Sequence, residues 1–450
     1  MATLHRHSLT APEVTYRSVT DDIAAVPLHY PSPRAWWTGF ACCLAAVAMF
    51  IAAAGWLFYR GLGIWGLQSP VFWGMMIASY VWWISMAHAG TMISGLLLLL
   101  NRGWRNSLNR FAEAMTAFAV IQAGIIPILH LGRPWLFYWL IPYPNTMQVW
   151  PQFKSPLEWD IFGVVSYLVV SILFWYVGLV PDLASVRDRA QGRLAQVFYG
   201  VLALGWRNSA IHWRRWQIAY WATAILTVAL VVVVESGVSL LFAVGIEPGW
   251  HTTIYPPFFL IEAVFEGFAV VLLIAITLRA TFALQHIVTE RHLDMLARLL
   301  LAFGLMTLYC HVFDTFDAWY SGDAYELQAL HERWSGAYAP LYWLSILFNV
   351  VIIQALWFRR VRRSGAALVP IAAAVTAGVW LGHFVEIASV LHRDYLPSSW
   401  GIYVPSAWEW ALFLGTVGLF FFLYFLFVRL LPMISMFELK EVLRQDMAET

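Results

Sequence analysis

The chain has little charge and few cysteines for its length. Only 12% of its 450 residues are charged, about half the share found in soluble domains. By contrast, 61% are hydrophobic and the mean hydropathy is +0.68. This composition excludes a soluble globular domain and predicts an integral membrane protein. The net charge of +1 does not indicate a nucleic-acid partner, and we expect none.

The cysteines lack the spacing that a protein-bound redox metal centre requires. Cys42, Cys43 and Cys310 match neither the motifs of iron–sulfur clusters nor that of covalently attached haem. We therefore predict no metal site in this chain and expect any metal redox centre in a partner. A haem held by His311 and His383, which both lie in outer halves of their spans, is disfavoured but stays open as an alternative.

Long apolar runs alternate with short polar connections along the whole chain. About 20 apolar residues are needed to cross roughly 30 Å of hydrocarbon, and helices satisfy their own backbone groups in lipid. We therefore predict an all-α fold with ten membrane-spanning helices. These lie near residues 36–59, 70–100, 111–130, 157–180, 216–245, 256–285, 292–313, 338–358, 365–391 and 405–431.

The basic residues are distributed unevenly between the two ends of these spans. If the N-terminus lies inside, all but five of the 27 Lys and Arg fall on the inner side, as expected for cytoplasmic segments. The exceptions are Arg60, Arg133, Lys154, Arg333 and Arg393. The first 35 residues are polar and include Pro27, Pro31 and Pro33, so we predict a cytoplasmic tail and not a cleavable signal.

Three outer loops enter the next span in the same way. Each pairs a Trp with a Pro a few residues later: Trp65 with Pro70, Trp250 with Pro256, and Trp400 with Pro405. Proline suits a first helical turn and tryptophan a membrane interface. Glu235 and Glu386 lie 15 and 14 residues before the second and third Trp. The pattern indicates a parallel internal repeat, although Trp and Pro could simply mark interfaces.

The repeat predicts two four-helix bundles, formed by spans two to five and six to nine, with the first and last spans at their flanks. The expected segments are a cytoplasmic tail (1–35), the first span with its outer loop (36–69), the first bundle (70–250), the second bundle (251–404), and the last span with a cytoplasmic tail (405–450). The longest outer loop, 131–157, is rich in prolines and aromatic residues. We expect it to be a docking platform or a cover.

Ionisable residues meet where this loop joins its two spans. His130 ends the third span and Asp160 begins the fourth, and consecutive spans are antiparallel, so both lie at the outer end. Pro134 disfavours helical geometry at Arg133, which therefore leaves the helix near Glu158. A histidine beside a carboxylate can accept protons near neutral pH. Ordinary interfacial charges are the alternative interpretation.

These residues also carry a resemblance to a known family. His130-Leu-Gly-Arg133-Pro, the aromatic loop, and Leu157-Glu-Trp-Asp160 resemble the NrfD/PsrC-type, or polysulfide reductase, membrane subunits. Within that family the ten spans and long cytoplasmic tail are most similar to the ActC-type subunit of bacterial alternative complex III. The resemblance covers nearly all of the chain from about residue 36.

The resemblance implies an outer quinol site, with menaquinol as the expected substrate. The implied binding residues are His130, Arg133, Trp135, Tyr138, Glu158 and Asp160, of which His130 and Asp160 carry the chemistry. Electrons would pass to a periplasmic iron–sulfur subunit and then to a multihaem cytochrome c subunit. A paralogous NrfD-like membrane subunit (ActF-type) and other small membrane subunits would complete a complex in the bacterial inner membrane. The chain is not expected to be active alone.

Other ionisable residues inside the spans could form a proton pathway. They are His88, Glu113, Glu235, Glu262, Glu266, His311, Asp314, His383 and Glu386. Helical spacing pairs Glu262 with Glu266, His311 with Asp314, and His383 with Glu386. Counting along the spans places Glu235 in an outer half and His88 deeper. A second quinol pocket and a polar network that joins helices are alternatives, as are a transporter subunit and a purely structural anchor.

Overall fold

The computed structural model describes residues 10–11, 13–31, 33–140, 156–393 and 396–449. Every regular element in these ranges is a helix, so the predicted all-α fold is confirmed. Ten helices are long and apolar enough to span a membrane, as predicted. They cover Arg34–Arg60, Met75–Leu99, Asn109–His130, Glu158–Arg189, Ala210–Ala243, Tyr255–Thr281, Glu290–Tyr320, Ala339–Trp357, Gly365–Leu391 and Ala407–Leu430.

The helices occupy most of the described residues. The helices of the N-terminal half are α1 (Tyr16–His29), α2 (Arg34–Arg60), α3 (Met75–Thr91), α4 (Leu97–Leu99), α5 (Asn109–His130), α6 (Pro156–Arg189), α7 (Arg193–Leu202) and α8 (Ala210–Ala243). Those of the C-terminal half are α9 (Tyr255–Thr281), α10 (Glu290–Tyr320), α11 (Ala324–Ser335), α12 (Ala339–Ile346), α13 (Arg359–Arg362), α14 (Gly365–Leu391), α15 (Ala407–Leu430) and α16 (Met436–Glu449). Short helical turns are η1 (Leu62–Ile64), η2 (Met92–Leu96), η3 (Gly103–Ser107), η4 (Pro134–Leu140), η5 (Leu347–Val351), η6 (Ile352–Trp357) and η7 (Pro397–Ser399).

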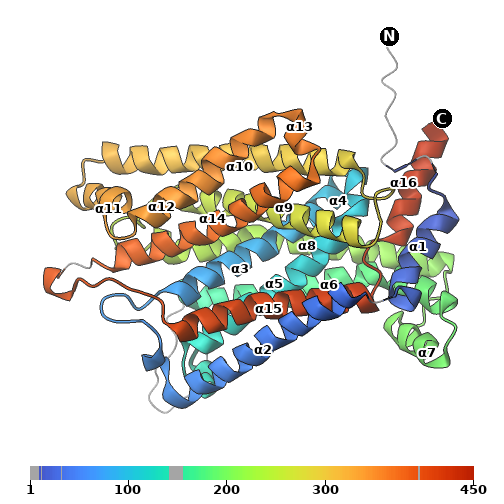
Figure 1. The fold of residues 1–450 in the computed structure, drawn as a ribbon, viewed down its shortest axis with the longest axis horizontal. Coiled ribbons are helices and arrows are strands. Elements are labelled where there is room, and N and C mark those ends of the chain that lie inside the picture. Colours follow the sequence, from blue (N-terminus) through green and yellow to red (C-terminus); the bar gives the residue numbers. More distant parts are fainter. Residues whose placement is uncertain (1–9, 12, 32, 141–155, 394–395, 450) are drawn as a thin grey trace, which may run out of the picture.

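The spans pack in two groups that meet along α3 and α9. Helix α3 packs against α5, α5 against α6, and α6 against α8, while α9 packs against α10 and α14, and α14 against α12 (Figure 1). At the contact between α3 and α9, an added Cβ on Gly267 would lie 1.7 Å from the Cβ of Ala89. Only glycine allows the two backbones to approach this closely.

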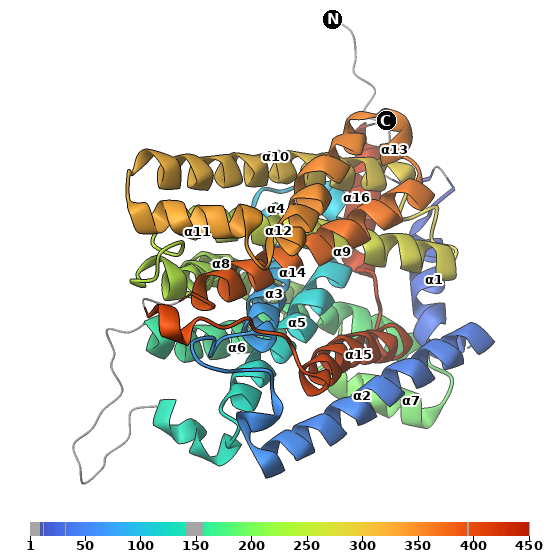
Figure 2. The ribbon, with the colours of Figure 1, turned by 60° about the vertical axis from the view of Figure 1, so that its left-hand side comes forward.

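The first and last spans form a separate pair at one side of the molecule. Helix α2 lies along α15 (Figures 1 and 2), with Phe50 and Ala46 packed against Gly415 and Gly418. Small residues of this kind let spanning helices approach closely in lipid. Most of the remaining α2 side chains are exposed, so this helix faces the bilayer over much of its surface.

Helices α1 and α16 lie together at one end of the molecule (Figure 1). Helix α1 lies in the segment that the sequence predicted to be a tail, and it buries Val19, Ile23 and Val26 against the rest of the fold. Its N-terminus is capped by reciprocal bonds between Thr15 and Ser18. Part of the predicted tail is thus an ordered helix, because an apolar stripe at helical spacing lies within its polar composition; its cytoplasmic location stays a prediction.

Candidate functional site

The candidate site begins at the turn that ends α5. His130 is the last residue of α5, and Gly132 has a φ of +64°. A Cβ on Gly132 would lie 2.8 Å from Leu62 Cγ of η1, so both the conformation and the space require glycine. The chain then enters η4 at Pro134. The His-Leu-Gly-Arg-Pro motif is therefore a helix end that holds His130 at the rim of the bundle.

His130 presents an open nitrogen at this rim. Its ring packs edge-on against Trp65, with 5.7 Å between the ring centroids. Its Nε2 atom is buried and has no hydrogen-bond partner among the described residues. Buried polar atoms are nearly always paired in folded proteins, so this nitrogen is a natural contact for a ligand.

Asp160 presents an open oxygen on the neighbouring helix. Tyr80 of α3 donates a hydrogen bond of 2.5 Å to Asp160 Oδ2, whereas Oδ1 is buried without a partner among the described residues. Glu158 Oε2 is buried and open in the same way. Helices α5 and α6 pack together, and both residues lie where these helices meet the outer loop.

The other residues predicted for the site are arranged more loosely. Within the described residues, no hydrogen bond or ion pair joins His130 to Asp160, or Arg133 to Glu158 or Asp160. Arg133 is exposed, as are Trp135 and Tyr138 in η4. The central part of the predicted docking loop, residues 141–155, lies outside the described residues.

A second polar group lies beneath Asp160, between α3 and α8. Glu235 accepts hydrogen bonds from Ser85 Oγ (3.3 Å) and from His88 Nδ1, and all three side chains are buried. The sequence placed Glu235 and His88 at different depths, and this prediction is wrong because the two side chains touch. Counting residues along a span gives the depth of a side chain only if all spans start at the same level. Helix α3 begins only at Met75, five residues after the predicted start.

Hydroxyl groups extend this polar line away from Asp160, toward the end of the bundle that the sequence predicts to be the inner end. The His88 ring packs on Tyr167 of α6, with 4.6 Å between the ring centroids. The hydroxyl of Tyr167 bonds with Thr91 Oγ1 (2.7 Å) and donates to the carbonyl of Ala87 (2.9 Å). Thr116 of α5 donates to the same carbonyl (2.7 Å). Each side chain here is buried.

A charged cluster closes the inner end of this first group. Arg110 of α5 donates to Glu113 (2.9 Å) and to Asp182 of α6 (3.1 Å), and Tyr220 of α8 donates to Glu113 (3.1 Å). All four side chains are buried. Breaking a buried ion pair is costly, so this cluster fixes α5, α6 and α8 relative to one another.

Helix α16 covers this cluster. Glu438 accepts hydrogen bonds from Arg105 and Asn109, and Asp182 Oδ1 accepts the backbone N–H of Met436 (3.2 Å). Asp182 thus supplies an acceptor to the first turn of α16, where N–H groups lack helical partners. Glu438 raises the pKa of Arg105 above its usual value despite the opposing effect of burial.

The second group contains its own acidic cluster, between α9 and α14. His383 lies between Glu262 (3.9 Å) and Glu386 (3.6 Å), so the predicted proximity of His383 and Glu386 is confirmed. Glu266 is buried, and neither of its carboxylate oxygens has a hydrogen-bond partner among the described residues. A buried carboxylate is costly inside a membrane, so Glu266 stays a candidate functional residue.

The outer rim of the second group differs from the sequence prediction. Asp314 accepts a hydrogen bond from Arg333 of α11 (2.7 Å), whereas His311 packs against Phe258 with 5.0 Å between the rings. Among the described residues no ion pair joins His311 to Asp314, because α11 folds back and its Arg333 pairs with the Asp314 carboxylate; the pairing of His311 with Asp314 stays a prediction. Burial opposes the charge of Arg333, but Asp314 outweighs burial and raises the pKa of the guanidinium. Arg393 pairs with Glu332; Asp394 lies outside the described residues.

Several residues of these networks were not predicted from the sequence. They are Tyr80, Arg105, Tyr167, Asp182, Tyr220 and Glu438. Tyrosines inside spans looked like ordinary apolar positions, and Arg105 and Glu438 belong to segments that looked like solvated loops. The residues described by the structure contain no group of three or more His, Cys, Asp or Glu arranged to hold a metal ion.

Comparison with known proteins identifies the family. A model of the polysulphide reductase NrfD family matches residues 64–393, which is well over half of the chain. The chain belongs to the NrfD family. The match runs from η1 to the end of α14 and includes His130 and Asp160, while α2 and α15 lie outside it.

Two relatives extend over most of this NrfD-family chain. A selenate reductase subunit of Mesobacillus selenatarsenatis is 23% identical over 397 residues, which cover 84% of this chain and 89% of that protein. The Hdr-like menaquinol oxidoreductase integral membrane subunit of Archaeoglobus fulgidus is 21% identical over 430 residues, 89% of this chain and 96% of that protein. Both are named as subunits of oxidoreductases, which agrees with a membrane subunit that works with partner subunits.

Proposed function

We propose that this chain is the quinol-oxidising membrane subunit of a respiratory complex of the alternative complex III type. The observation that carries the proposal is the pair of open, buried polar atoms at one end of the first group, His130 Nε2 and Asp160 Oδ1. They lie on adjacent helices, and a quinol has two hydroxyl groups that need such acceptors. The name of the Archaeoglobus relative favours menaquinol.

In the proposed chemistry these two residues accept the protons of the quinol, and a partner subunit accepts its electrons. Oxidation of a quinol to a quinone releases two protons and two electrons. His130 and Asp160 accept the hydroxyl protons, as a general base does, and Tyr80 holds Asp160 in place. The two electrons leave to an iron–sulfur cluster in a periplasmic partner and then to a multihaem cytochrome c, because this chain is proposed to hold no metal of its own.

The proposed orientation places this site at the periplasmic face of a bacterial inner membrane. Both termini then lie in the cytoplasm, which agrees with the excess of Lys and Arg at their end of the molecule. The exposed Arg133 and the exposed η4 residues Trp135 and Tyr138 form, with Glu158, the proposed rim of the quinol pocket and the surface for the iron–sulfur partner. An ActF-type paralogue and small membrane subunits are the other proposed partners.

A second candidate function, proton conduction, rests on the polar residues inside both groups. In the first group, Glu235, His88 and Glu113 lie on the polar line between Asp160 and α16. In the second, Glu262, Glu266, His383 and Glu386 form the acidic cluster, with His311 and Asp314 nearer the rim. We propose that they release or translocate the protons of quinol oxidation. If they do, Glu262→Gln or Glu386→Gln changes the ratio of protons released to electrons transferred; an unchanged ratio would count against it.

The test of the quinol site is a pair of substitutions in the assembled complex. Asp160→Asn and His130→Ala should each lower quinol oxidation by about 10²- to 10⁴-fold, the usual contribution of a general base. Assembly should be retained, and His251→Ala, an exposed outer histidine, should have no effect. Normal turnover in both variants would eliminate the site. Loss of assembly without loss of turnover per assembled complex would favour a structural anchor.

A further inference from the structure

An indole N–H beside the candidate site is buried and has no partner. Trp65 follows η1 in the connection between α2 and α3, and only 5% of its surface is exposed. Its Nε1 atom makes no hydrogen bond within the described part of the chain. The Trp65 ring packs edge-on against the ring of His130, with 5.7 Å between the centroids, and His130 Nε2 is open as well. Two open polar atoms therefore belong to two rings in direct contact.

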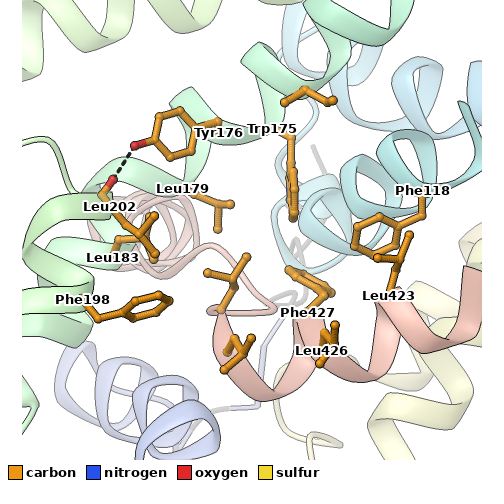
Figure 3. Close-up of a pocket in the computed structure, with 13 residues that line it drawn as sticks. Phe118, Trp175, Tyr176, Leu179, Leu183, Phe198, Leu202, Leu423, Leu426 and Phe427 are labelled. Atoms are coloured by element: carbon orange, nitrogen blue, oxygen red, sulfur yellow. Dashed lines mark hydrogen bonds between the residues drawn. The ribbon is translucent and has the colours of Figure 1, made fainter. Parts of the chain in front are cut away.

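An open indole N–H does not by itself indicate a binding site. Trp175 of α6 also has a buried Nε1 atom without a partner among the described residues. Figure 3 shows its surroundings, a hollow of about 350 Å³ lined by apolar side chains such as Leu179 and Phe427. Of the residues described, no carboxylate or imidazole lines this hollow. Trp65 differs because it lies against His130, which has an open nitrogen of its own.

The backbone fixes the position of Trp65. The N–H of Trp65 donates to the carbonyl of Leu62 (3.0 Å), and the N–H of Gly66 donates to Glu409 Oε2 of α15 (2.7 Å). A Cβ on Gly66 would lie 2.0 Å from the carbonyl oxygen of Val404, so the chain can pass this point only as glycine. The indole is thus held in place without a hydrogen bond of its own, and its N–H stays available.

The same glutamate also anchors the start of α3. Glu409 accepts a hydrogen bond from the hydroxyl of Tyr403, and this hydroxyl accepts the N–H of Met75 (3.0 Å), the first residue of α3. Tyr80, which donates to Asp160, lies five residues further along this helix. One buried carboxylate therefore anchors the loop that carries Trp65 and the helix that positions Asp160.

A quinol needs donors as well as acceptors during its oxidation. The hydroxyl of a quinol both donates and accepts hydrogen bonds, whereas the carbonyl oxygen of a quinone only accepts. An indole N–H only donates, so it can bond to this oxygen before and after the reaction. When a base removes the hydroxyl proton, negative charge develops on the oxygen, and a fixed donor stabilises that charge.

We propose that Trp65 is a quinol-binding residue, whose indole N–H donates a hydrogen bond to the oxygen that loses its proton to His130. The second hydroxyl proton passes to Asp160, the two electrons leave to the iron–sulfur partner, and the indole keeps its own proton. The inference rests on the proposed function, and it adds a fixed donor to the two acceptors of that site.

A matched pair of variants in the assembled complex tests this role. Trp65→Phe and Trp175→Phe each remove a buried, open indole N–H. We expect kcat/KM for menaquinol to fall by roughly 10- to 100-fold in Trp65→Phe, the size of the effect of a hydrogen bond to a charged group, and to stay normal in Trp175→Phe. Equal kinetics in the two variants would overturn the proposal.

A second replacement separates the hydrogen bond from the packing against His130. Benzothienylalanine at position 65 keeps the shape of the indole ring and carries sulfur in place of the N–H. If the N–H makes the contact, this replacement lowers kcat/KM as much as Trp65→Phe does. A variant with benzothienylalanine that turns over quinol normally would show that only the ring matters, and the proposed bond would be wrong.

Infrared spectroscopy of bound menaquinone, isotope-labelled at its carbonyl carbons, observes the hydrogen bond itself. A donor lowers the stretching frequency of the carbonyl that it contacts. We expect this frequency to rise in the benzothienylalanine variant and to keep its wild-type value in Trp175→Phe. An unchanged frequency in both overturns the inference.

The variants of the two acceptors distinguish this inference from the proposed function. If His130→Ala and Asp160→Asn are inactive while both replacements of Trp65 are normal, the quinol site stands and the role of Trp65 is wrong. If His130→Ala and Asp160→Asn turn over quinol normally, the whole site is eliminated and the role of Trp65 with it.

Discussion

At the scale of single residues, the proposed quinol site depends on which polar atoms are satisfied and which stay open. Asp160 has one oxygen held by Tyr80 and one open, so the tyrosine orients the carboxylate without occupying it. His130 is oriented by packing against Trp65 instead. The two proton acceptors are thus positioned by different means, one by a hydrogen bond and one by a ring contact.

Tyr80→Phe tests this positioning. A hydrogen bond to a charged group contributes about 1.5–3 kcal/mol, so kcat/KM for quinol should fall by roughly 10- to 100-fold. Tyr424→Phe is the control, because its hydroxyl bonds only to the backbone carbonyl of Phe111. Steady-state kinetics of the purified complex measure both. Equal kinetics for wild type and Tyr80→Phe would show that Asp160 needs no orienting donor.

At the scale of elements, the ends of helices determine where the candidate site lies and where α16 docks on the charged cluster around Arg110. The turn after α5 needs a left-handed residue beside Leu62, and α16 needs Asp182 and Glu438 to dock on the inner cluster. Neither requirement is a property of the helix alone. Both arise where a helix end meets another part of the chain.

Gly132→Ala tests the turn. A non-glycine residue in the left-handed region costs about 1–2 kcal/mol, and the contact with Leu62 adds to this cost. The thermal unfolding temperature of the complex should therefore fall. Gly124→Ala lies in α5 with open space around it and should leave stability unchanged or raise it, because alanine favours helices. A Gly132→Ala variant as stable as wild type would contradict the geometry of this turn.

Glu438→Gln tests how α16 is held in its docked position. It leaves the buried guanidinium of Arg105 without its anion, and such a loss costs about 3–5 kcal/mol. We expect α16 to undock and become sensitive to limited proteolysis. Glu441→Gln on the same helix removes only an exposed pair with Arg444 and should keep α16 protected. Equal protection in the two variants would mean that apolar contacts alone hold the helix.

The positions of the helices could be predicted from the sequence, whereas the side-chain contacts between helices could be predicted only in part. The ten spans follow from apolar runs, because lipid admits few other structures. His383 and Glu386 share one helix, so their helical spacing was enough to predict that they lie close together. Asp314 with Arg333, and His88 with Glu235, join different helices. Their contacts depend on tilt and on where each span starts, which the residue pattern does not encode.

At the scale of the whole molecule, the proposed orientation assigns each end of the bundle to one side of the membrane. It can be tested by cysteine labelling in a variant that lacks Cys42, Cys43 and Cys310. Ser398→Cys, exposed near α15 at the proposed outer end, should react with a membrane-impermeant maleimide in intact cells. Gln191→Cys, exposed between α6 and α7, should react only after permeabilisation. The reverse pattern would invert the orientation.

The pairing of α2 with α15 has a consequence for how the protein is made. Helix α2 leaves the ribosome some 350 residues before its partner α15. At 5–20 residues per second, synthesis of the intervening chain takes roughly 20 to 70 s. During that time α2 must reside in the bilayer without its native neighbour, which its apolar surface allows. The pairing of α2 with α15 is therefore a late step in the membrane insertion of this protein.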